Sequence, residues 1–444
     1  MKFSNSIKKK LLIILSFSIS SVLLAKNINA SILQNSNKEV IDHVWQIIYR
    51  DFLDFNGEFN KSNWIKLRKK LLAKRYRDSS DAYDAIREML KKLKDPYTRI
   101  LDPKEFSQMR IETSGELTGV GIQLVKDQES GDLIIISPIE GSPAFKAGLK
   151  SKDKIISIDM ISTKNMEIDQ AVNLIRGERG TKIKLGIYRN GNLFYKSLLR
   201  DKIEIKSVTS KINSTKEGFF VGYVRIKQFN ANASKELKNI LFELEDKNIS
   251  GYVLDLRNNP GGLLDSSIDI SRQFISKGII VSTLSKDGLT DVKKGSGKAI
   301  TDKPLVVLVN ERSASASEIV SGAIKDNNRG KLVGKKTYGK GLVQSMRTLI
   351  DGSGLTVTVA KYLTPNGKDI NKFGIIPDKE VNMNINPILR NEFGTRKDNQ
   401  YRVAENELLK IIKNQKSLVK FDPSSTNIIS VFNKRVAQVK YVLN

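Results

Sequence analysis

The sequence predicts an α/β protein (α+β overall) made of three units in a row. Its 444 residues are more than one hydrophobic core usually supports, since single cores rarely grow past roughly 250–300 residues. Apolar residues recur at helical spacing in the first part, and short strands with turns dominate the middle. In the last part, continuous apolar runs alternate with helical stripes, which is typical of a crossover sheet.

The first 30 residues have the pattern of an export signal. A 14-residue apolar stretch, 11–24, follows four lysines, Lys2, Lys8, Lys9 and Lys10. A membrane-spanning helix needs about 20 apolar residues, so this stretch is short for a permanent anchor. The basic, apolar and small residues in that order indicate a secretory signal peptide at 1–30, cleaved after Ala25 or Ala30. An uncleaved signal anchor is the alternative, and either reading predicts an exported protein.

The segment 31–112 is predicted to be a helical N-terminal domain. Three apolar stripes at helical spacing carry this prediction, and they lie in 41–52, 64–71 and 82–93. The pair Asp95-Pro96 ends the third stripe, because proline cannot continue a helix.

The residue inventory excludes several kinds of enzyme. The chain has no cysteine and a single histidine, His43. It therefore has no disulfide, no cysteine nucleophile and no thiolate metal site, and a zinc site of two or three imidazoles is impossible. A Ser-His-Asp triad would need His43 as its base. We interpret His43 as a solvated residue, because it lies opposite much of the apolar stripe of its predicted helix.

The segment 113–201 reads as short strands, tight turns and two short helices. It contains the runs Gly-Val-Gly-Ile at 119–122 and Gly-Ser-Pro-Ala at 141–144, and a helical stretch from 168 to 176. The order of these motifs resembles a PDZ domain. PDZ domains bind a peptide C-terminus as an added strand and hold its carboxylate on backbone N–H groups. The resemblance implies a peptide site made of Gly119, Val120, Gly121, Ile122 and Ile168.

The segment 202–385 is predicted to be an α/β core. Apolar strands at 219–226, 251–256 and 304–309 are separated by helical stripes, of which 237–244 is the clearest. The last stretch, 386–444, is a polar and basic C-terminal extension with helical pieces, and the sequence does not indicate its role.

One motif in this core suggests nucleotide binding and fails on inspection. Residues 334–340 match the phosphate-binding pattern G-x-x-x-x-G-K, but Gly341 stands where the loop needs a hydroxyl to hold magnesium. We expect neither a metal nor a nucleotide cofactor.

Three other motifs of the core point to a peptidase. They are Asp-Leu-Arg-Asn-Asn-Pro-Gly-Gly at 255–262, Ser-Ala-Ser-Ala-Ser at 313–317 and Tyr-Gly-Lys-Gly-Leu-Val-Gln at 338–344. Together they resemble the carboxyl-terminal processing (tail-specific) peptidases, which use a Ser-Lys dyad. The resemblance implies Ser315 as the nucleophile, Lys340, 25 residues later, as the base, and Gln344 as the third residue.

The residues suit those roles chemically. A serine hydroxyl becomes a good nucleophile when a base takes its proton, and a lysine can be that base only when burial keeps it neutral. A nucleophile at a helix N-terminus also has N–H groups at hand for the oxyanion. We expect Ala316 and Gly261 to donate them, with Gly262 in reserve. The structural alternative is that Ser315 merely caps the following helix in an S-x-x-E box with Glu318.

Arg176 ends the predicted PDZ helix. A cation there compensates the helix dipole in the ordinary way. The family resemblance implies a second role, in which Arg176 relays peptide binding to the active site.

The helical region and the chain just after it resemble the photosynthetic branch of the family more narrowly. Three segments carry this resemblance: 59–64, 95–99 and 114–121. That branch trims the C-terminal extension from the precursor of a photosystem II reaction-centre protein. The expected function is a serine endopeptidase that binds and cleaves C-terminal tails, in the thylakoid lumen or the periplasm. A general periplasmic tail-specific protease and a non-catalytic PDZ scaffold are the alternatives.

The formal net charge of +27 falls to +22 when the predicted signal is removed. Such a charge favours acidic partners, either nucleic acid or an anionic membrane surface. No nucleic-acid recognition motif accompanies it, and the lysines are spread through all three units, so we expect no nucleic acid and retain membrane association.

Overall fold

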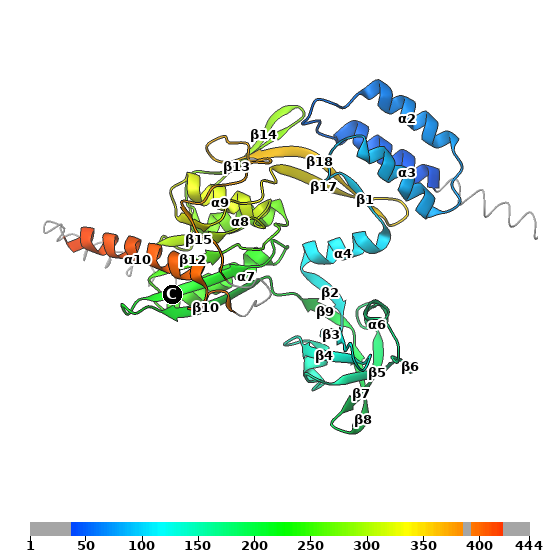
Figure 1. The fold of residues 1–444 in the computed structure, drawn as a ribbon, viewed down its shortest axis with the longest axis horizontal. Coiled ribbons are helices and arrows are strands. Elements are labelled where there is room, and N and C mark those ends of the chain that lie inside the picture. Colours follow the sequence, from blue (N-terminus) through cyan, green and yellow to red (C-terminus); the bar gives the residue numbers. More distant parts are fainter. Residues whose placement is uncertain (1–36, 385–391, 421–444) are drawn as a thin grey trace, which may run out of the picture.

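The computed structural model describes residues 37–384 and 392–420, and the predicted signal at 1–30 lies outside them. Figure 1 shows three units: a group of helices, a small strand-rich module and a larger α/β core. No helix in the described ranges is long and apolar enough to cross a membrane. The mixed helix-and-sheet class predicted from the sequence is confirmed.

The core is built on a six-stranded sheet. β10 is antiparallel to its neighbour and the other pairs are parallel. Its central strands are buried on both faces, as their continuous apolar sequences predict. In spatial order the strands are β10 (Val208–Ser214), β11 (Phe220–Ile226), β12 (Gly251–Asp255), β15 (Leu305–Val309), β16 (Lys331–Gly334) and β19 (Lys379–Glu380).

Helices cover both faces of this sheet. One apolar cluster joins it to α7 (Ala233–Asp246), α8 (Leu264–Phe274) and α9 (Ala316–Asp326). A second cluster joins its other face to α10 (Asn399–Lys420), seen in Figure 1 along the sheet. The core therefore extends past the predicted boundary at 385, and the described part of the C-terminal extension is one of its layers.

The N-terminal helices form a separate bundle with an apolar core of their own. Asp78 caps one of them and Asp102 another, each accepting a hydrogen bond from a first-turn backbone amide. The elements are a helix over 37–51, α2 (Lys61–Ala73), α3 (Ser79–Lys91), β1 (Arg99–Leu101) and α4 (Pro103–Ser114).

A second sheet joins this bundle to the core. β1 pairs antiparallel with β18, so Ile100 lies opposite Leu355. Leu355 and Val357 of β18 pack in the core of the helical bundle. No sequence pattern predicted β1, because a strand of three residues is too short to show the alternation of apolar and polar residues. The other strands are β13 (Ile279–Ser285), β14 (Gly288–Lys294), β17 (Leu342–Thr348) and β18 (Gly354–Leu363).

The middle unit has the strand order expected of a PDZ domain. The two-stranded ladder of β2 (Glu116–Gly119) with β9 (Asp201–Glu204) carries the chain in and out of it. The unit contains β3 (Ile122–Lys126), β4 (Leu133–Pro138), α5 (Pro143–Lys146), β5 (Lys154–Ile158), β6 (Ile161–Ser162), α6 (Ile168–Ile175), β7 (Lys182–Arg189) and β8 (Asn192–Leu199). Figure 1 shows it apart from the core, beyond that ladder.

The packing of α10 makes a stability prediction. Leu408 is fully buried against the sheet, whereas Lys410 is exposed on the same helix. We expect Leu408→Ala to lower the free energy of unfolding by about 2–5 kcal/mol in urea titrations, because it leaves a cavity. Lys410→Ala should change it by no more than about 0.5 kcal/mol. Equal small effects would show that α10 is not part of the core.

Candidate active site

A cavity of about 420 Å³ lies where the core, the second sheet and the helical domain meet. Ser315, Lys340 and Gln344 all line it, so the structure brings together the serine motif at 313–317 and the lysine motif at 338–344. Leu342 and Val343 line it as well, as expected for an apolar pocket around a lysine. Among the described residues, none of the PDZ strands β3–β8 contributes to the lining.

Ser315 stands at the N-terminus of α9 in a strained conformation. Its φ of 54° and ψ of −114° place a non-glycine residue in a sparsely populated backbone region. Such strain costs on the order of 1–3 kcal/mol and is common at active sites. The turn holds the hydroxyl in the cavity at the positive end of the helix.

Glu318 links the serine segment to the lysine segment. Its carboxylate is fully buried and accepts from the amide of Ser315 at 2.9 Å and the amide of Lys340 at 2.8 Å. It also accepts from the Gly339 amide at 2.7 Å and the Thr337 hydroxyl at 2.6 Å. Burial raises the pKa of Glu318, and these four hydrogen bonds oppose that rise. The S-x-x-E spacing predicted the contact of Glu318 with Ser315. Its contacts with the lysine segment could not be predicted from spacing and became visible only in the folded structure.

Lys340 lines the cavity as a half-buried side chain. Burial lowers the pKa of its amine, and the nearby Arg99 acts in the same direction, while Asp95 and Glu318 oppose it. The Nζ atom lies 4.7 Å from the ring centroid of Tyr97. Within the described ranges no hydrogen bond joins Nζ to the Ser315 hydroxyl. Catalytic hydrogen bonds are often long before substrate binds.

Gln344 follows on β17. Its amide nitrogen donates to the Thr358 hydroxyl at 3.3 Å, so in this structure Gln344 is anchored to β18 beside the lysine. Thr358 donates in turn to Asp95 at 2.7 Å. The third residue of the motif is thereby connected to the helical domain.

One of the N–H groups expected to bind the oxyanion is already engaged in a hydrogen bond. Gly261 packs against Ser315 so closely that a Cβ there would lie 2.9 Å from the serine Cβ. Its N–H, however, donates to the Asn259 side chain at 2.9 Å and is not available. No acceptor among the described residues takes the N–H of Gly262 or Ala316, and both residues line the cavity. Of the two glycines, Gly262, the reserve candidate, is therefore the one whose N–H has no acceptor among the described residues.

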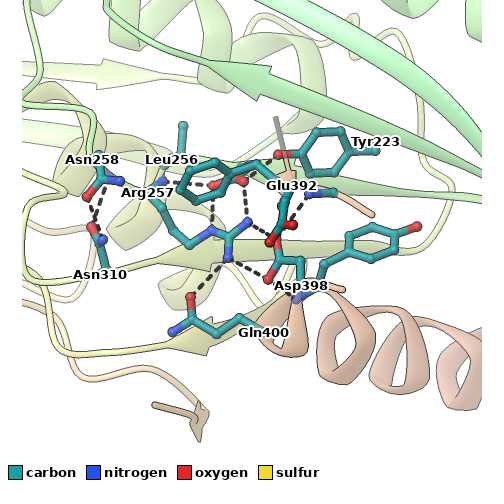
Figure 2. Close-up of polar contacts among 12 residues, drawn as sticks. Tyr223, Leu256, Arg257, Asn258, Asn310, Glu392, Asp398 and Gln400 are labelled. Carbon is teal, nitrogen blue, oxygen red and sulfur yellow. Dashed lines mark hydrogen bonds and ion pairs between the residues drawn. The ribbon is translucent and has the colours of Figure 1, made fainter. Parts of the chain in front are cut away.

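A buried charge network stabilises the strand end that carries these glycines. Arg257 is completely buried, and its guanidinium contacts Asp255 at 2.6 Å and Asp398 at 2.6 Å. In Figure 2 the Arg257 side chain points toward Asp398 and Gln400. Gln400 accepts from Arg257 at 3.0 Å, and the Tyr223 hydroxyl donates to Asp255 at 2.6 Å. The segment before α10 thus supplies the second carboxylate that pairs with Arg257 of the 255–262 loop. The sequence did not indicate this role.

Comparison with known proteins agrees with this geometry. The model of peptidase family S41 matches residues 220–381, and the PDZ domain model matches residues 108–188. A carboxyl-terminal-processing protease of Synechocystis is 43% identical over 362 residues, covering 81% of this chain and 84% of its own. The chain belongs to the S41 carboxyl-terminal processing peptidases. It is a serine-type peptidase with a PDZ domain.

Two further relatives of this S41 peptidase are named for the chloroplast or for photosystem II. The chloroplastic C-terminal processing peptidase of Tetradesmus obliquus is 37% identical and covers 77% of each chain. A solved structure titled photosystem II D1 C-terminal processing protease is 37% identical, with a TM-score of 0.51, over 78% of this chain and 93% of that one.

The predicted peptide site of the peptidase lies between β3 and α6. Gly119 ends β2, Val120 is fully buried, and Gly121 has a φ of 77°. A Cβ on Gly121 would lie 2.3 Å from the Cβ of Ser142, so only glycine fits there. Ile122 at the start of β3 and Ile168 at the start of α6 are both partly buried against the module's core.

Arg176 caps the C-terminus of α6 through its backbone, with its amide donating to Val172 at 2.9 Å. In the part of the chain that the structure describes, its side chain makes no hydrogen bond or ion pair. The structure therefore gives the relay role no contact to act through.

The Glu318 bridge makes a prediction for the peptidase. Glu318→Gln should lower kcat/KM by roughly 10–100-fold, because the amide nitrogen replaces one carboxylate oxygen and cannot accept from the two donors that bind that oxygen. The free energy of unfolding should fall by about 1–3 kcal/mol. Kinetics on a C-terminal peptide and urea titration measure both, and Glu311→Gln, at an exposed residue of the same loop, is the control. Full activity in Glu318→Gln would contradict the bridging role.

Proposed function

We propose that Ser315 and Lys340 are the catalytic dyad of an endopeptidase that cleaves near substrate C-termini. The PDZ groove binds the carboxyl end of the tail. Ser315 Oγ attacks the scissile carbonyl while Lys340 takes its proton, and Lys340 then gives a proton to the leaving amine. Water hydrolyses the acyl-enzyme by the same route in reverse. The observation that carries the proposal is a strained serine and a half-buried lysine lining one cavity.

The N–H groups of Ala316 and Gly262 would hold the oxyanion of the tetrahedral intermediate. Gln344 would fix the lysine's surroundings through Thr358. These roles use only side chains and backbone amides of the chain.

We propose the precursor of a photosystem II reaction-centre protein as the substrate. The support is the similarity to the photosystem II D1 C-terminal processing protease, at 37% identity, and to the cyanobacterial and chloroplastic relatives. A general tail-specific protease is the alternative, since a processing protease of Bacillus subtilis is 39% identical over 67% of this chain. The two substrate hypotheses can be separated by incubating the protein with a precursor tail and with an unrelated tail. The products are identified by mass. The export signal in the sequence supports a site of action in the thylakoid lumen or the periplasm.

Ser315→Ala and Lys340→Ala should each abolish cleavage of a C-terminal peptide, because each removes a reacting group. Lys340→Arg should be equally inactive, since arginine stays charged. Peptide binding, measured by fluorescence anisotropy, should persist in all three. Cleavage at the wild-type rate by any one of them would overturn the dyad. Peptide binding without cleavage by the wild type would instead support the PDZ scaffold.

The activity should rise with pH. Lys340 acts as a base only when neutral, and its protonated fraction falls as the pH passes its pKa. Burial lowers that pKa from the ordinary lysine value, so the rise in kcat/KM should occur below the pH at which an exposed lysine titrates. A pH–rate profile measures it. A rise that coincides with the titration of an exposed lysine would contradict the assignment.

We also propose that the peptidase associates with anionic membrane surfaces through α2. From 59 to 77 the chain carries eight lysines and arginines and no acid. Of these, Lys66, Lys69, Lys70 and Lys74 are exposed on one helix. Lysines near an anionic surface contribute about 1 kcal/mol each to binding.

Replacing these four lysines by glutamine should weaken binding to phosphatidylglycerol-containing vesicles at least roughly tenfold in co-sedimentation. Binding to pure phosphatidylcholine vesicles should stay low for all proteins. A control with the same change in charge replaces four exposed lysines elsewhere, Lys235, Lys238, Lys410 and Lys413. Equal loss in both variants would attribute binding to the net charge and not to α2.

A further inference from the structure

The helical domain supplies one wall of the active-site cavity. Pro96 and Tyr97 line it from the turn after α3, and Arg99 lines it from β1. Met109 and Glu112 line it from α4. The turn reaches the cavity because β1 fixes it to β18. A domain whose apolar core is separate from that of the α/β core therefore contacts the reacting groups directly.

Within this wall, Tyr97 faces the proposed base. Lys340 Nζ lies 4.7 Å from the centroid of the Tyr97 ring, which is within the range of a cation–π contact. Burial and the neighbouring Tyr338 hydroxyl raise the pKa of Tyr97 to about 12. The phenol is thus neutral at any working pH, and what it presents to the lysine is the negative face of its ring.

The Tyr97 backbone is fixed from both sides of the domain boundary. Asp95 is buried and accepts from the Tyr97 amide at 3.0 Å and from the Thr98 hydroxyl at 2.6 Å. It also accepts from the Thr358 hydroxyl on β18 at 2.7 Å, while the Thr358 amide donates to Thr98 at 3.0 Å. This network holds the turn in one position against the strand that also anchors Gln344.

The ring face adds to a finely balanced environment around Lys340. Burial disfavours the ammonium form, and Arg99 repels it. Asp95 on the turn and Glu318 on α9 attract it, although Glu318 is already engaged by four donors. An aromatic face stabilises a cation without adding a full charge or a hydrogen-bond acceptor. It therefore favours the ammonium, which forms when Lys340 has taken the serine proton.

We propose that Tyr97 is a positioning residue of the dyad, whose ring seats Lys340 Nζ and sets how readily that base takes up a proton. The inference rests on the proposed Ser315–Lys340 function. It makes the helical domain part of the catalytic machinery, because Tyr97 and its supporting Asp95 both come from that domain. The family motifs of the core do not include this residue.

The test compares pH profiles of kcat/KM for the full chain with Tyr97→Phe and Tyr97→Leu, on a fluorogenic C-terminal peptide. Phenylalanine keeps the aromatic face and leucine keeps only the apolar bulk. Loss of the face should destabilise the ammonium, so Tyr97→Leu should shift the acidic limb to lower pH by about one unit. Tyr97→Phe should leave the limb where the wild type has it. Circular dichroism checks the fold, and Tyr97→Met replaces the leucine variant if that variant does not fold.

The inference would be overturned if the acidic limb of the kcat/KM profile stayed in place or moved to higher pH in Tyr97→Leu. Equal shifts in both variants would also overturn it, because they would assign the effect to the hydroxyl. Ser315→Ala separates this failure from that of the proposed function. If Ser315→Ala is inactive and the limb does not move in Tyr97→Leu, the Tyr97 role alone is wrong. If Ser315→Ala still cleaves, the dyad itself is wrong and the inference fails with it.

Discussion

The buried carboxylate of Glu318 is the interaction on which the site depends. An isolated buried carboxylate is costly, and here four donors stabilise it, three of them backbone amides. Two of those amides belong to Ser315 and Lys340, so one charge fixes the segments of both proposed reacting residues. The strained turn at Ser315 persists because this carboxylate holds the serine amide from within α9.

A second group of buried charges also joins segments that are distant in the sequence. Arg257 is paired with Asp255 on β12 and with Asp398 before α10, and all three are completely buried. Removing one partner of such a cluster leaves an uncompensated charge in a dry interior, which is far more costly than the cluster itself. The loop that carries Gly261 and Gly262 is therefore fixed by an ion pair between residues 141 positions apart. The segment that leads into the C-terminal helix supplies one of those residues, which its polar sequence did not indicate.

The active site is assembled from two domains while the PDZ module stands apart. The core supplies Ser315 and Lys340, and the helical domain supplies Tyr97 and Asp95 across β1 and β18. The PDZ module is attached by the ladder of β2 with β9 and, among the described residues, adds nothing to the cavity lining. Substrate capture and chemistry therefore occupy different surfaces, which suits an enzyme that recognises a tail end and cleaves at some distance from it.

By itself the sequence determined the class of the protein and its proposed reacting residues. Apolar runs identified the core strands, helical spacing identified the bundle, and the motif resemblance placed Ser315 and Lys340. These signals are local, or lie within motifs that the sequence displays intact. Only the tertiary structure decided which glycine amide remains available, because Asn259 takes the N–H of Gly261 and leaves that of Gly262. It alone brought Tyr97 to Lys340 and Asp398 to Arg257. Contacts between residues more than 100 positions apart have no periodicity or spacing to reveal them, since chain folding and not sequence distance brings the charges together.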